Sequence, residues 1–349
     1  MHLLVIRFSA IGDVALSIPV LKALTEQHPE VEVTVLSRPH FQSLFEPLGV
    51  HFVGANLESE HQGPQGLWKL YQRIINDHKP DRVVDLHAVL RTHILASFFK
   101  MGGIPVYQID KGRKEKKALT RRKNKVRVPL RHTMLRYVEV FEKSGLRLRA
   151  HPSEPALPHY QSAAADQQWQ NLHLSGTVIG IAPMASFAGK SWPQQKMRDL
   201  IILLLEQNYK VLLFGGPDDV ASLDELSAGR DGVYNVASKL KFNGEIALMN
   251  KLRLMISMDS SNMHLATLAA IPVVSIWGAT HHYAGFAPIG HNDHLMAEVR
   301  VEELGCRPCS VFGSKPCFRK DYACLNWLEP SDVMTKVEKA LQESNSSQN

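Results

Sequence analysis

Three loops of the sequence carry side chains that could perform acid–base or phosphate chemistry. The first, residues 7–13, ends in Gly12-Asp13, and the second, residues 182–193, contains Lys190. The third, residues 258–264, combines Asp, Ser and His side chains. Each loop follows a short apolar run and precedes a helical pattern, so each is expected at the carboxyl end of a strand. Open α/β sheets bind their ligands at that edge.

Asp13 has two interpretations on spacing alone. It caps the helix that follows, which contributes about 1 kcal/mol, or it serves as a general base for a substrate hydroxyl. Gly12 lets another backbone approach closely, but the loop lacks the G-x-G-x-x-G run of a dinucleotide site.

Gly189-Lys190-Ser191 imitates the end of a phosphate-binding P-loop. The earlier glycine that such a loop requires would be position 184, which is Met184, so a Walker-type ATPase is not expected. Lys190 is then either a surface charge or a point charge placed to meet a phosphate.

The third loop joins a predicted strand to a predicted helix. Backbone N–H groups at a helix start form an anion site, and Ser260 and Ser261 would add hydroxyl donors. His264 lies about one turn further on and should face the same side. Asp259 would repel a phosphate, so it contacts sugar hydroxyls or fixes the loop. Alternatively, Asp259 or Ser260 caps the helix and His264 belongs to the core.

A fourth turn, residues 214–219, contains two glycines and two aspartates. Its glycines would let a ribose lie close to the backbone, with Asp218 as a ribose partner. A plain turn with a capping aspartate is the other interpretation.

Positive charge is concentrated in one segment. The chain has a net charge of +6, and ten Lys or Arg residues lie within residues 111–127, opposed only by Glu115. Such a run is either a solvated loop or a patch for phosphates and carboxylates of a nucleic acid, an anionic lipid or a glycolipid.

All four cysteines fall together, at Cys306, Cys309, Cys317 and Cys324. A structural zinc site, disulfide bonds and reduced thiols are all open interpretations. Disulfides are disfavoured in a reducing compartment.

Apolar runs alternate with helical patterns, which predicts an α/β protein with parallel sheets. The expected strands are 3–8, 31–36, 82–86, 106–109, 178–182, 210–214, 254–258 and 273–276. The expected helices are 14–26, 67–77, 92–99, 134–144, 194–207, 220–227, 244–248, 262–270 and 332–341.

The chain of 349 residues is long enough for two domains. Residues 150–158 contain three prolines and are expected to link a domain of residues 1–155 to one of residues 165–330. Residues 331–349 are expected to form a final helix and a disordered polar tail. Neither a membrane span nor an export signal is recognised, which favours the cytoplasm.

Four motifs in order resemble the signatures of glycosyltransferase family nine, which contains the ADP-heptose:lipopolysaccharide heptosyltransferases. They are RFSAIGD, GKSWP, FGGPDD and DSSNMHLATLAAIPVVSIWGAT, and the likeness extends from residue 2 to about 330. The resemblance implies a GT-B fold, with two Rossmann-like domains whose parallel sheets face a central cleft. It also implies inverting, metal-independent heptose transfer from ADP-heptose to a lipopolysaccharide inner-core acceptor, with no cofactor.

The resemblance also assigns roles. Asp13 would be the catalytic base, and Lys190 with Ser186 would hold the pyrophosphate and stabilise the departing ADP. The donor pocket would comprise Asp259, Ser260, Ser261 and His264, and Asp218 would join it as the ribose partner that its turn suggests. The anionic glycolipid acceptor would contact Arg91, Lys111, Arg113, Arg121, Arg122 and Arg131, with His132 nearby. The basic segment would meet that acceptor through peripheral contact with the inner face of the inner membrane.

Two other classes of function remain open at this point. The same fold could use another nucleotide-sugar for a different surface glycan. A non-enzymatic protein could bind nucleic acid or membrane through its basic segment, but that segment has no interleaved aromatic residues, so no nucleic-acid partner is expected.

Overall fold

The computed structural model describes residues 1–290 and 293–346, which form two compact units. The first unit comprises Met1–Lys111 and His132–His159, and the second comprises Gly112–Arg131 and Tyr160–Asn349. No helix in the described part of the chain is long and apolar enough to cross a membrane.

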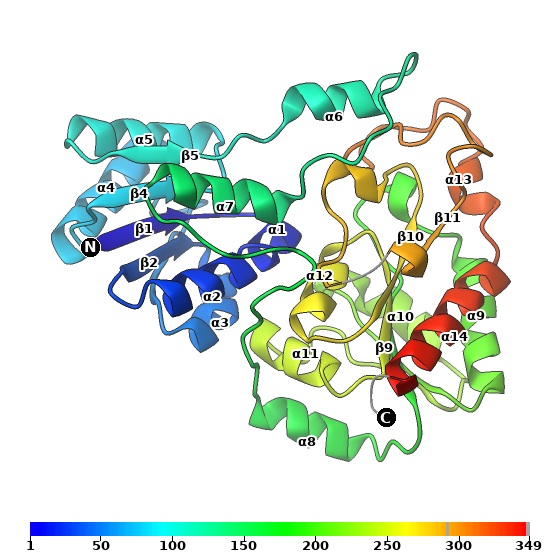
Figure 1. The fold of residues 1–349 in the computed structure, drawn as a ribbon. Helices are drawn as coiled ribbons and strands as arrows, with labels where there is room; N and C mark the ends of the chain where they lie inside the picture. The colour runs from blue at the N-terminus through cyan, green and yellow to red at the C-terminus, as the bar shows by residue number, and fades with distance from the viewer. Residues whose placement is uncertain (291–292, 347–349) are drawn as a thin grey trace. The chain divides into compact units, whose positions relative to one another are not determined.

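The first unit contains one parallel sheet with the strand order β3-β2-β1-β4-β5. Its strands are β1 (His2–Ile6), β2 (Glu32–Ser37), β3 (His51–Gly54), β4 (Arg82–Asp85) and β5 (Val106–Gln108). Its helices are α1 (Ile11–Ala15), α2 (Ile18–Gln27), α3 (Gln42–Phe45), α4 (Gly63–Asp77), α5 (Leu90–Met101) and α7 (Thr133–Lys143). Helices α4 and α5 lie together against this sheet (Figure 1). Their apolar side chains share one core with residues of β1, β2, β3 and β4.

The second unit contains a parallel sheet with the order β11-β10-β9-β6-β7-β8. Its strands are β6 (Val178–Ala182), β7 (Lys210–Leu213), β8 (Val233–Asn235), β9 (Leu254–Met258), β10 (Val273–Trp277) and β11 (Met296–Glu298). Its helices are α6 (Arg113–Thr120), α8 (Ala163–Asn171), α9 (Gln194–Glu206), α10 (Val220–Ser227), α11 (Phe242–Met249), α12 (Ser261–Leu268), α13 (Ala323–Asn326) and α14 (Pro330–Ser346). Helix α14 lies beside α9, and both contribute to the core on one face of the sheet (Figure 1).

Both sheets are doubly wound, as the alternation of strands and helices predicts. The order reads 3-2-1-4-5 in the first unit and 3-2-1-4-5-6 in the second, counting within each unit. In such sheets the connections that follow two neighbouring central strands run to opposite sides, and a crevice forms between the carboxyl ends of these two strands.

The structure corrects three expectations. Residues 112–131, which the prediction places in the first domain as a loop, contain α6 and pack with the second unit. The single helix expected over residues 14–26 is two helices, with Pro19 in the first turn of the second. Helix α14 is longer than expected and packs on the second unit, and residues 347–349 of the predicted tail lie outside the described residues.

Candidate active site

The predicted loops lie at the points where strand order reverses. In the first unit this point is between β1 and β4, and residues 7–13 follow β1. In the second unit it is between β6 and β9, and residues 182–193 and 258–264 follow those two strands. Because β6 and β9 are neighbours, their carboxyl ends bring Lys190 and Asp259 to one place.

Asp13 is the third residue of α1 and its side chain is bound to Arg7. The N-cap is Ala10 and no side chain caps the helix, so the capping interpretation of Asp13 is wrong. Arg7 Nη2 lies 2.5 Å from Asp13 Oδ2, and Arg7 Nη1 donates to the Leu86 carbonyl. Among the described residues no group bonds to Oδ1, and a quarter of the Asp13 side chain is exposed. One carboxylate oxygen is therefore oriented while the other is open to an incoming proton.

A group of cations surrounds His87, which follows β4. Burial, together with the charges of Arg7, Lys111, Arg38 and Arg91, lowers the pKa of His87 to about 3. The imidazole is therefore neutral at physiological pH, and its Nδ1 has no hydrogen-bond partner among the described residues. The four cations follow β1, β2, β4 and β5 at the carboxyl edge of the first sheet, where Arg7 also pairs with Asp13 and Arg38 with Glu58.

Of these side chains, the sequence analysis predicted only Arg91 and Lys111 as site residues. Arg7, Arg38 and His87 follow β1, β2 and β4 respectively, so their position directly after apolar runs is the signal that could have identified them.

Lys190 and Asp259 form a partly buried ion pair in the second unit. Lys190 Nζ lies 2.9 Å from Asp259 Oδ2, and the two side chains are 16% and 8% exposed. The ammonium group has three protons, so two remain for other acceptors. Asp259 thus holds the lysine at the end of its loop, which agrees with the expectation that it fixes the loop.

The loop of Lys190 is held from two sides. The indole of Trp192 is buried and donates to the carbonyls of Leu325 and Leu328. On the other side, the Ala279 N–H donates to the Gly189 carbonyl at 2.8 Å. These bonds fix the backbone on both sides of Lys190.

The other predicted donor residues follow β6, β7 and β9 in the second unit. Ser186 is exposed, and Ser260 and Ser261 begin α12 without a side-chain cap bond. His264 is buried on α12. Asp218 is exposed in the turn after β7, and its neighbour Asp219 makes the capping bond, accepting from the Gly216 N–H at 2.8 Å.

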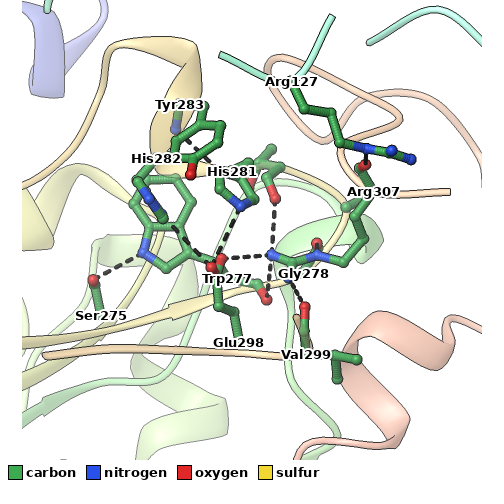
Figure 2. Close-up of polar contacts among 12 residues, drawn as sticks. Arg127, Ser275, Trp277, Gly278, His281, His282, Tyr283, Glu298, Val299 and Arg307 are labelled. Atoms are coloured by element: carbon green, nitrogen blue, oxygen red, sulfur yellow. Dashed lines mark hydrogen bonds and ion pairs between the residues drawn. The ribbon is translucent and has the colours of Figure 1, made fainter. Parts of the chain in front are cut away.

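The predicted acceptor residues are divided between the units. Arg91 and Lys111 belong to the first unit, and Arg113, Arg121, Arg122 and Arg131 belong to the second. Part of the basic segment makes structural contacts. Lys125 Nζ donates to the Pro308 carbonyl at 2.6 Å, and Arg127 donates to the Gly305 carbonyl. Arg127 also donates to the Arg307 carbonyl (Figure 2). Lys116 and Arg122 lie over the rings of Phe286 and Phe318.

The four cysteines are free thiols, so the disulfide interpretation is wrong for this structure. Burial raises the pKa of Cys324 to about 12 and also raises those of Cys306 and Cys309. Within residues 1–290 and 293–346, no three of the four sulfur atoms lie within 4.8 Å of one another, as a closed zinc site would require.

One other group has the ligand types of a cation site. The ligand atoms of His281, His282 and Glu298 lie within 4.8 Å of one another. However, Tyr283 N–H donates to His281 Nδ1, so the His281 proton is on Nε2, which faces Glu298 Oε1 at 3.3 Å (Figure 2). Arg307 Nη2 lies 2.9 Å from the other carboxylate oxygen. The guanidinium already supplies the positive charge that a metal ion would bring.

The pKa shifts agree with this charge distribution. Burial lowers the pKa of His281, which keeps the imidazole neutral. Burial opposes ionisation of Glu298, but the hydrogen bond from His281 and the charge of Arg307 outweigh it and lower the carboxyl pKa. Glu298 is therefore an ionised partner of Arg307.

Two doubly wound units, each with polar side chains at its switch point, form the GT-B architecture. The whole chain superposes on the solved structure of Escherichia coli ADP-heptose lps heptosyltransferase II with a TM-score of 0.72 at 18% identity, covering 99% of this chain and 100% of that one. That likeness shows the fold.

The sequence comparisons give the family. The model described as "Glycosyltransferase family 9 (heptosyltransferase)" matches residues 67–315. Lipopolysaccharide core heptosyltransferase OpsX of Haemophilus influenzae is 22% identical over 84% of each chain. Lipopolysaccharide heptosyltransferase 3 of E. coli is 35% identical over 34% of this chain, and the match spans only 38% of that protein. The chain belongs to glycosyltransferase family 9 and is a heptosyltransferase-type enzyme.

Proposed function

We propose that this enzyme transfers a heptose from ADP-heptose to the inner core of lipopolysaccharide, with inversion and without a metal ion. The named substrates of its relatives, ADP-heptose and lipopolysaccharide, support this choice. The observation that carries the mechanism is the Asp13 carboxylate, which has one oxygen on Arg7 and the other open.

In this mechanism Asp13 Oδ1 takes the proton of an acceptor hydroxyl as its oxygen attacks the anomeric carbon. The bond from that carbon to the β-phosphate oxygen breaks on the opposite face, and ADP leaves with the electron pair. Lys190 Nζ offsets the charge that develops on the leaving phosphate. Ser186, the start of α12 and His264 line the donor pocket, and Asp218 and Asp259 contact donor hydroxyls.

The acceptor is anionic, and two groups of cations are available for it. One is the edge around His87, with Arg91 and Lys111; the other is the exposed side of the basic segment, with Arg113, Arg121, Arg122 and Arg131. We propose that the cations around His87 bind the acidic groups of the acceptor near its reacting hydroxyl. The exposed cations of the basic segment would bind phosphates of the glycolipid at the membrane surface, where contact is peripheral.

The test of this function is ADP release from ADP-heptose with a truncated core acceptor, in the presence of EDTA. Acceptor-dependent release is expected, and the product should have the inverted anomeric configuration. A panel of other nucleotide-sugars is the control for donor identity. Faster release from another nucleotide-sugar, or a strict requirement for a divalent cation, would contradict the proposal.

Neutralising four exposed cations of the basic segment should weaken acceptor binding selectively. The variant changes Arg113, Lys114, Lys117 and Lys123 to Gln and leaves Lys125 and Arg127, whose bonds hold the segment in place. We expect the KM for the glycolipid acceptor to rise about tenfold, because long-range attraction to phosphates is lost. The effect should shrink at high salt.

A charge-matched control changes four exposed lysines elsewhere to Gln. Lys69, Lys100, Lys143 and Lys339 lie on four other helices, and their loss should leave the acceptor KM within about twofold. The KM for ADP-heptose should be unchanged in both variants. Equal loss of donor and acceptor binding in the first variant would contradict the assignment.

A further inference from the structure

Arg307 is a wholly buried arginine whose guanidinium binds the backbone of one turn. Its side chain is 0% exposed, and it donates to the carbonyls of Trp277, Gly278, Thr280 and Val299 as well as to Glu298 (Figure 2). An arginine has five N–H donors in a rigid fork. All three nitrogens donate here: Nε and Nη1 each to one acceptor and Nη2 to three. Three of the four carbonyls belong to residues 277–280, which are the last residue of β10 and the turn that follows it.

This turn is bonded to the loop of Lys190. Ala279 lies between two residues that Arg307 holds, and its N–H donates to the Gly189 carbonyl at 2.8 Å. Its own carbonyl accepts from the N–H groups of Cys309 and Ser310. The peptide groups of Ala279 therefore connect the arginine's segment directly to the residue that precedes Lys190.

The backbone of both segments packs closely against the lysine and its loop. A Cβ added at Gly278 would lie 2.5 Å from the Gly189 carbonyl oxygen. A Cβ added at Gly313, six residues after Arg307, would lie 2.6 Å from Lys190 Cγ. The lysine stem thus rests against the backbone of the loop that contains Arg307, while its ammonium group is held by Asp259.

We propose that Arg307 is a positioning residue of the donor site, which fixes the turn of residues 277–280 so that Lys190 meets the diphosphate of the nucleotide-sugar. This rests on the donor role proposed above for Lys190. A buried Arg–carboxylate pair is weak evidence for stability, because an apolar replacement of both partners is often neutral or better. The four bonds from Arg307 to backbone carbonyls instead fix the conformation of residues 277–280. The bond from Ala279 N–H to the Gly189 carbonyl connects that conformation to the position of Lys190.

The first test is Arg307→Lys, which keeps the charge beside Glu298 but loses the planar fork. We expect a folded protein whose affinity for ADP, used as the probe, falls about tenfold. The kcat for transfer should fall as well, and the KM for the acceptor should not change. A merely structural role would alter thermal stability without this selective loss of ADP affinity. A folded Arg307→Lys variant with wild-type ADP affinity would overturn the proposal.

A double-mutant cycle shows whether Arg307 acts through Lys190. In a Lys190→Gln background, Arg307→Lys should have no further effect on ADP affinity, because the side chain that it positions is gone. An equal loss in both backgrounds contradicts the positioning role. If Lys190→Gln itself leaves ADP binding unchanged, the donor assignment of Lys190 fails instead, so the two failures are distinguishable.

A second pair of variants keeps the proposal testable if Arg307→Lys does not fold. Gly313 and Gly229 both have positive φ, +77° and +67°, so alanine is strained at either position. Only at Gly313 does the new methyl group meet Lys190; at Gly229 nothing lies within 4 Å. Gly313→Ala should weaken ADP binding several-fold and Gly229→Ala should not. Wild-type ADP binding by a folded Gly313→Ala variant would also overturn the proposal.

Discussion

Asp13→Asn should lower kcat for heptose transfer by a factor between about 10² and 10⁴ while ADP affinity stays within twofold. Asparagine has nearly the same shape, and its amide oxygen can still accept from Arg7 Nη2, which lies 2.5 Å from Oδ2 in the structure. The amide cannot take a proton from the acceptor hydroxyl, so the contribution of general-base catalysis is lost. The measurement is initial rate of acceptor-dependent ADP release at saturating donor.

The matched control is Asp77→Asn, an aspartate in the same unit at the end of α4 whose Oδ2 lies 3.8 Å from Nε of Arg73, four residues earlier. It should retain transfer activity within about twofold. Circular dichroism and ADP titration establish that both variants are folded. An Asp13→Asn variant with more than one-tenth of wild-type kcat would remove Asp13 as the base and leave it as a partner that orients Arg7.

The central strands of both sheets could be predicted because they are continuous apolar runs. β6 and β9 have the predicted bounds; β4 and β10 differ by one residue at one end, and β1 by one residue at its start and two at its end. The strands that the prediction missed, β3, β8 and β11, all lie at sheet edges and have three or four residues. An edge strand is half solvated and short, so it leaves little periodicity to recognise.

The basic segment shows why charge can hide a helix. In α6 most of the residues before Ala118 are charged, and only Leu119 and Thr120 are buried. No apolar stripe indicates the period of 3.6 residues. The placement of the segment with the second unit depends on bonds from Lys125 and Arg127 to backbone carbonyls near residue 305, and a sequence pattern carries no information on such partners.

The loops that carry the candidate site residues could be predicted from the sequence, but the contacts between those residues could not. The rule that ligands collect at strand carboxyl ends located Asp13, Lys190 and Asp259. The ion pair of Lys190 with Asp259 requires β6 and β9 to be neighbours, although β7 and β8 separate them in sequence. The cations around His87 likewise come from four different strands and depend on strand order. Arg307 had no local signal, since its partners are backbone carbonyls.

Lys190→Gln should also lower kcat strongly, by about 10²- to 10³-fold, and should weaken ADP binding. A neutral amide can still donate to Asp259, but it cannot offset charge that develops on the leaving phosphate. Because Asp259 is only 8% exposed, loss of its cation leaves a nearly buried carboxylate uncompensated. Breaking such a pair costs up to about 3–5 kcal/mol, so the variant will also be less stable.

The double variant Lys190→Gln with Asp259→Asn separates these two effects. Its amide pair keeps a hydrogen bond and removes the uncompensated charge, so stability should return toward that of the wild type. Activity should stay low, because the positive charge beside the diphosphate is still absent. Recovery of both stability and transfer in the double variant would mean that the ion pair only maintains the fold. Recovery of stability alone is the result expected if Lys190 acts on the leaving group.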